Sequence, residues 1–225
     1  MKLGHYFFEA PIDFDVCCIQ NLVVEDQRTL SGFIYEMISQ NEGESGGFIL
    51  SNNNSELDLT KGLQIILDPF RVDLNSRTNL SALYSDICRE SHDERNIVST
   101  NHLLNSISEH ISNLISEQDI SVSFSKEANI SDILKMMGVG FEKDEEGGLP
   151  TLLSQYISVC YKYASTKLFV FVNLRRFMSE NDIELFCSFA LYSKIPLLLI
   201  EGTDLGISKK CPTKIIDPDL CEINC

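Results

Sequence analysis

Apolar runs of strand length that end in a polar side chain constrain the fold of this chain most. Leu63–Leu67 ends at Asp68, and Lys167–Val172 ends at Asn173. Each run is short, mainly apolar and rich in branched or aromatic residues, which is typical of a buried strand in an α/β sheet. Polar side chains at the carboxyl edge of such a sheet hold the metal in many nucleotide-binding proteins. The runs therefore predict an α/β fold and raise the question of a nucleotide site.

Amphipathic helices separate the strand-like runs. Residues 102–116 and 152–164 both place their apolar side chains at helical spacing, and the helix that follows Asn173 begins at a capping pair, Ser179 and Asp182. Strands at both ends of the chain with helices between them predict an α/β body that carries a helical insertion. We expect an α/β head domain at 1–79 and 166–225 and a mainly helical leg domain at 80–165.

A phosphate-binding loop is missing from the sequence. Neither the G-x-x-x-x-G-K-[ST] string nor G-x-G-x-x-G occurs. After the strand-like run Cys17–Val24, where such a loop would lie, the chain reads Glu25-Asp26, and two acids at a helix start repel phosphate. No recognisable Cys–His arrangement points to nucleophilic catalysis. The sequence therefore disfavours an NTPase, while the many acids leave catalysis by a pair of carboxylates open.

The net charge of −15 disfavours nucleic-acid binding, but the charge is unevenly distributed. The window 147–179 contains no Asp or Glu, and it holds Lys162, Lys167, Arg175 and Arg176. Salt screens charges beyond roughly 8–10 Å, so a local basic patch can act on its own. The window is equally compatible with a core helix and strand, where acids are scarce. The candidate DNA-contacting residues are Lys162, Lys167, Arg175, Arg176, Lys135 and Lys143.

Two further residue types are candidate metal ligands. The eight cysteines form no C-x-x-C pair and lie beside no histidine cluster, which favours bystander thiols over a zinc site. Four acids around the end of the long helix offer the oxygen ligands that calcium prefers, although a solvated acidic surface is the alternative. These candidate calcium ligands are Glu117, Asp119, Glu127 and Asp132.

The first fifteen residues, with one lysine and a broken aromatic run, do not form a signal peptide, and no apolar run spans the ~20 residues that a bilayer requires. We therefore expect a cytoplasmic protein with no membrane partner. In that compartment the thiols stay reduced.

Several segments together resemble one family in order and spacing. They are NLVVED at 21–26, IILDPFRVDLNS at 65–76, ILKMMGVGFE at 133–142, KLFVFVN at 167–173 and PLLLIE at 196–201. On these residues the chain resembles the Csn-two family, the accessory DNA-end-binding protein of type II-A CRISPR-Cas adaptation, over nearly its whole length. Two departures are that only Lys167 remains of a lysine cluster before its strand, and that ISVSFS at 120–125 replaces an acidic segment.

The resemblance implies an α/β head of the P-loop-ATPase type that has lost its nucleotide site, with an α-helical leg as an insertion. It also implies a homotetrameric ring, supported by Ca²⁺, whose positive lumen holds linear double-stranded DNA ends without reading their sequence. Such a protein is not an enzyme, and it assists spacer acquisition, a step of antiviral defence, together with other CRISPR adaptation proteins. Two alternatives remain open, a divergent P-loop-like NTPase that uses Asp68 or Asn173 and a protein-interaction module of an adaptation complex.

Overall fold

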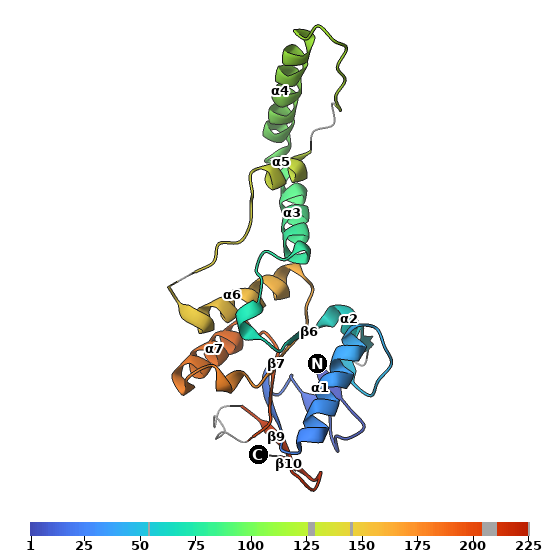
Figure 1. Ribbon diagram of the computed structural model, residues 1–225, viewed down its shortest axis with the longest axis vertical. Coiled ribbons are helices and arrows are strands. Elements are labelled where there is room, and N and C mark those ends of the chain that lie inside the picture. The colour runs from blue at the N-terminus through green and yellow to red at the C-terminus, as the bar shows by residue number, and fades with distance from the viewer. Residues whose placement is uncertain (54, 126–128, 145, 204–210, 225) are drawn as a thin grey trace. The chain divides into compact units, whose positions relative to one another are not determined.

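The computed structural model describes residues 1–53, 55–125, 129–144, 146–203 and 211–224. The chain divides into two compact units (Figure 1). The first, called the sheet unit here, comprises Met1–Leu74 and Lys143–Cys225. The second, called the helical unit, is Asn75–Glu142. The structure thus has the mixed α/β composition that the sequence predicts.

Six strands of the described part of the chain form the main sheet, in the order β10-β9-β3-β8-β7-β6. Their bounds are β3 (Ile19–Val24), β6 (Leu63–Ile66), β7 (Leu168–Val172), β8 (Leu197–Glu201), β9 (Thr213–Ile216) and β10 (Glu222–Asn224). All neighbours pair in parallel except β10, which is antiparallel to β9. Every residue of β3, β7 and β8 is buried, as expected for parallel strands that are covered on both faces.

The order in which the chain visits these strands places a switch point at β3. The chain passes from β3 to β6 at one edge of the sheet, and then returns through β7 and β8 to β9 on the other side of β3. Right-handed crossovers in opposite directions put their helices on opposite faces. Figure 1 accordingly shows α1 (Gln27–Asn41) and α7 (Glu180–Ser193) on opposite sides of the strands. In such sheets ligands bind beyond the carboxyl ends of the strands.

Successive side chains of each strand pack on alternate faces. On one face, Val170 and Leu198 share a core with Phe33 and Met37 of α1. On the other face, Phe171 packs edge to face against Phe186 of α7, with ring centroids 5.3 Å apart. The helix α6 (Gly148–Tyr163) contacts α7 on that side and buries its own apolar stripe. Shorter helical segments of this unit are α2 (Leu59–Gly62), η1 (Pro69–Arg71) and η2 (Leu174–Arg176).

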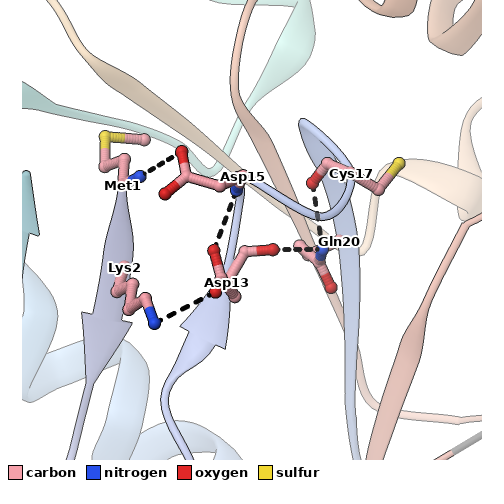
Figure 2. A network of polar contacts seen from close by, with 6 residues as sticks. All are labelled: Met1, Lys2, Asp13, Asp15, Cys17 and Gln20. Carbon is pink, nitrogen blue, oxygen red and sulfur yellow. Dashed lines mark hydrogen bonds and ion pairs between the residues drawn. The ribbon is translucent and has the colours of Figure 1, made fainter.

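A small antiparallel sheet in the order β2-β1-β4-β5 extends the same core. Its strands are β1 (Lys2–Gly4), β2 (Ile12–Asp13), β4 (Ile49–Asn52) and β5 (Ser55–Leu57). Asp13 ties it to the start of β3, as Figure 2 shows. Its carboxylate accepts a hydrogen bond from the Asp15 amide, which lowers its pKa, and pairs with Lys2, while its carbonyl accepts from the Gln20 side chain.

The helical unit contains α3 (Arg77–Ser91), α4 (Ile97–Ser116) and α5 (Ile130–Met136). Ser76 and Asn129 cap α3 and α5 by accepting from backbone N–H groups in the first turn. The segment after α5 is fixed to the start of α3, because Asn75 exchanges two hydrogen bonds with the backbone of Phe141. The Tyr84 hydroxyl donates to the Val139 carbonyl at 2.7 Å. No residue of α4 itself is buried.

The compact units do not coincide with the expected head at 1–79 and 166–225 and leg at 80–165. The helical unit spans 75–142, and the sheet unit resumes at 143. The difference is α6, whose amphipathic pattern the sequence reveals but whose partner it does not. Leu153 and Ile157 of α6 are fully buried, and the helix packs against α7, so α6 belongs to the sheet unit.

Candidate nucleic-acid interface

The carboxyl edge of the main sheet gathers three polar strand ends. Because Val172 pairs with Ile200 and Ile66 with Phe171, the residues that follow these strands lie along the same edge. They are Asp68 after β6, Asn173 after β7 and Glu201 at the end of β8. The sequence predicts the first two as strand ends, and the structure adds Glu201.

Asn173 connects two of these strand ends. It has left-handed backbone angles, with φ 53° and ψ 34°, which Asn tolerates better than most residues. Its side-chain oxygen accepts a hydrogen bond from the Gly202 amide at 3.2 Å, and its own amide donates to the Ile200 carbonyl at 2.8 Å. Asn173 therefore has a structural role in the turn that joins β7 to η2.

The Glu201 side chain is hydrogen-bonded to the backbone of this turn. Its carboxylate is buried, at 3% exposure, and accepts a hydrogen bond from the Arg175 amide at 3.1 Å. Desolvation raises the pKa of Glu201, although that hydrogen bond and the positive charges of Arg175 and Arg176 oppose the shift. A buried carboxylate thus lies close to both arginines and fixes the backbone that presents them.

The two arginines differ in what they face. Arg175 is half-buried, and its positive charge reaches Cys187 and Cys211, whose pKa values burial raises to about 12 and about 11. Arg176 is exposed. The sequence gives no reason to distinguish the two arginines, but in the structure Arg175 is partly buried and Arg176 is exposed to solvent.

The remaining candidate cations do not join this edge as one patch. Lys167 precedes β7, and Lys162 lies near the end of α6 with its ammonium 4.7 Å from the Tyr163 ring centroid. The five-residue strand β7 separates Lys167 from the arginine turn by about 17 Å. Lys143 is exposed at the start of the second segment of the sheet unit. Lys135 lies in the helical unit and pairs with Asp132 at 3.1 Å.

The Asp26 carboxylate lies at the amino-terminal end of α1. The Asp26 carboxylate caps this helix by accepting from the side chain and the amide of Thr29, which lowers the pKa of Asp26. A negative side chain therefore occupies the place where a phosphate would meet the N–H groups of the first turn. This geometry does not suit a nucleotide phosphate.

The candidate calcium ligands are dispersed where the structure describes them. Glu117 follows α4, Asp119 lies in the exposed segment beyond it, and Asp132 is engaged by Asn129 and Lys135 in α5. Glu127 lies outside the described residues. Across those residues, no group of three or more His, Cys, Asp or Glu side chains is arranged to hold a metal ion. The described cysteines are free thiols.

Two exposed phenylalanines on this edge were missed by the sequence reasoning. Phe70 in η1 is 61% exposed and Phe177 at the end of η2 is 48% exposed. Their rings meet edge to face, with centroids 5.4 Å apart. The signal that predicts the pair is the parallel layout of the two strand ends, because each has a polar cap, a short turn and a Phe beside an Arg, in Asp68-Pro-Phe-Arg71 and Asn173-Leu-Arg-Arg-Phe177.

No helix in the described ranges is long and apolar enough to cross a membrane. Among curated proteins, none matches the chain. One similar solved structure is MJ1267, an ATP-binding cassette of an ABC transporter, in its ADP conformation. It shares 10% sequence identity over 88% of this chain and 75% of that chain, with a TM-score of 0.38. The family model of the CRISPR-associated protein (Cas_Csn2) matches residues 40–220, which is most of the sequence, and the chain therefore belongs to this family of CRISPR-associated proteins.

Proposed function

We propose that this protein is a non-enzymatic, homotetrameric ring that binds the ends of linear double-stranded DNA without reading their sequence and assists spacer acquisition in type II-A CRISPR adaptation. The observation that carries the proposal is membership of the Cas_Csn2 family. The exposed cations Lys167 and Arg176, which flank β7 in the acid-free window, support it.

Assembly resolves the conflict between the acidic chain and its polyanionic partner. Non-specific affinity for DNA comes from neutralised phosphates, and one copy with few exposed cations in the window binds DNA weakly. A closed ring multiplies these cations by symmetry and encloses the duplex, so that only a free end enters. The acids outside the window then disfavour binding to the rest of the surface.

We further infer that the sheet unit is a P-loop-ATPase-like head without a nucleotide site. The doubly wound sheet with its switch point at β3 supports this inference, as does Asp26 at the helix start where phosphate would bind. Asp68 is also engaged, because it accepts from the Phe70 amide and pairs with Arg71 at 3.4 Å. ATP hydrolysis by the purified protein that disappears in a folded Asp68→Ala variant would contradict a non-enzymatic role.

The experiment that tests the proposal compares linear and closed circular forms of the same duplex at increasing salt. We expect retention of the linear form only, with log K falling by about 0.9 per log unit of salt for each neutralised phosphate. Equal retention of both forms would overturn the ring. A protein that stays monomeric and ignores DNA would favour the interaction-module alternative.

The cations and calcium are tested separately. Lys167→Ala and Arg176→Ala should each weaken binding to all sequences alike and reduce the salt slope by about one. Lys2→Ala is the matched control, because Lys2 is exposed in the small sheet and already pairs with Asp13. Solution mass measured with and without Ca²⁺ tests whether calcium supports the assembly.

A further inference from the structure

The carboxyl edge of the sheet presents a pair of exposed aromatic rings on a hydrogen-bonded backbone. The Phe70 amide donates to the Asp68 carboxylate at 3.0 Å. The Phe177 amide donates to the Leu174 carbonyl at 3.0 Å, and Leu174 is buried. The backbone under both rings is therefore ordered before any ligand arrives, which reduces the entropic cost of binding.

One arginine lies beside each of the two rings in the sequence. Arg71 follows Phe70 directly, with a side chain that is 87% exposed, and exposed Arg176 precedes Phe177. The acids nearby are mostly engaged. Asp68 pairs with Arg71, Asp182 is held in the capping box of α7, and Glu201 is buried. Two further exposed acids lie close along the chain, Asp73 three residues after Phe70 and Glu180 at the start of α7.

Flat apolar rings flanked by guanidinium groups match the chemistry of nucleobases on a phosphate backbone. Bases stack on aromatic side chains whatever their identity, because every base has a π-face, while arginines meet the adjacent phosphates. Inside a duplex these faces are covered by neighbouring base pairs. They become available only at a terminus or in unpaired terminal nucleotides.

We propose that Phe70 and Phe177 stack on the terminal or unpaired bases at the end of linear DNA, with Arg71 and Arg176 on the phosphates of the same nucleotides. This inference rests on the proposed function and adds to it a contact that recognises an end by its exposed base face. It accounts for end recognition without sequence reading, and it does not depend on ring closure. An apolar protein segment would lack the phosphates that these arginines require.

The test uses the full-length protein and fluorescently labelled duplexes that end in short unpaired 3′ tails. In matched duplexes the tail nucleotides are abasic, so that the phosphates stay and the bases are removed. The wild-type protein should bind the tail with bases about tenfold more tightly than the abasic tail, because one stacked base contributes about that factor. The variant Phe70→Leu/Phe177→Leu, which keeps the apolar bulk, should lose this ratio while keeping its affinity for the abasic tail.

Tyr192→Leu is the matched control, because Tyr192 is an 89% exposed aromatic residue of α7 away from the pair, and it should keep the full ratio. A wild-type protein that binds linear duplex with equal affinity for both tails overturns the stacking role and leaves the proposed function standing. A wild-type protein that fails on every duplex but still distinguishes the tails as single strands overturns the proposed function and supports the stacking role. A leucine variant that changes solution mass with an unchanged ratio assigns the rings to a protein contact, which also overturns the inference.

Discussion

At the scale of single residues, the carboxyl edge shows how far chemistry can be read from residue type alone. The sequence identifies Asn173 and Asp68 as polar strand ends, and the structure explains both by local geometry, a left-handed turn and a cap on η1. Their roles in the fold need no ligand. Sequence reasoning did not include Glu201 among the candidate site residues. Its buried carboxylate lies close to the two arginines and has a raised pKa, so its titration can be used to probe this edge of the sheet.

Glu201→Gln should change how stability depends on pH. Desolvation raises the pKa of Glu201 in the folded state above the ordinary value of 4.5. The folded protein therefore binds more protons than the unfolded chain, and this residue's contribution to stability falls as pH rises from about 4.5 through the raised pKa. Urea titrations should show the Gln variant gaining stability over wild type as pH rises.

Glu222→Gln is the control with the opposite sign. Desolvation opposes ionisation of Glu222, but hydrogen bonds from Lys214, from the Glu9 amide and from Asn224 outweigh it and lower its pKa. Its contribution is present above the unfolded pKa and is lost as pH falls. The same pH trend in both variants would contradict the assignment for Glu201.

Substitutions at Asn173 should separate backbone strain from the lost hydrogen bond. Asn173→Gly and Asn173→Ala both remove the bond to the Gly202 amide, and both must adopt the left-handed backbone, which is unfavourable for alanine but not for glycine. We expect the alanine variant to be less stable than the glycine variant by about 1 kcal/mol in urea unfolding. At Ser188, an exposed position within α7, the order should reverse, because glycine is the poorer helix former. If the alanine variant of Asn173 is as stable as the glycine variant, the left-handed backbone at this position is not strained.

At the scale of elements, the hydrophobic pattern predicts whether a segment is a helix or a strand better than it predicts where that segment begins and ends. Continuous apolar runs predict β7 and β8, because strands buried on both faces need apolar residues throughout. The run Leu3–Phe8 resembles a single strand, but β1 ends at Gly4. From His5 onward the chain turns, and His5 packs among Phe8, Phe33 and Phe48, a long-range aromatic contact that no local pattern encodes. The Phe70–Phe177 contact also joins residues far apart in the sequence, but there the similar order of residues after the two strands does indicate it.

Substitutions at two leucines, one in α6 and one in α4, test whether α6 is part of the core of the sheet unit. Leu153 of α6 is fully buried, whereas Leu114 of α4 is 51% exposed, and the sequence pattern gives both a place on an apolar helix face. Leu153→Ala should lower the free energy of unfolding by about 2–5 kcal/mol, because it leaves a cavity. Leu114→Ala should change it by no more than about 0.5 kcal/mol. Comparable losses in the monomeric protein would show that α4 packs as tightly as α6.

At the scale of the whole molecule, the net charge of −15 gives salt opposite effects on assembly and on DNA binding. Copies of an acidic chain repel one another, and salt weakens that repulsion as the Debye length falls from about 30 Å at 0.01 M to about 8 Å at 0.15 M. The same salt weakens phosphate contacts. At protein concentrations below full assembly, DNA retention by the proposed ring should therefore rise and then fall with salt. Once assembly is saturated, retention should only fall.

Sedimentation velocity and DNA binding, measured on the same samples across that salt range, distinguish these regimes. The mass should increase over the interval in which retention rises, because the additional DNA binding comes from newly formed rings. If retention falls steadily at every protein concentration while the mass increases, single copies bind DNA as well as assembled ones do. The aromatic edge with Phe70, Phe177 and Arg176 would then suffice to capture a DNA end, and ring closure would serve a later step.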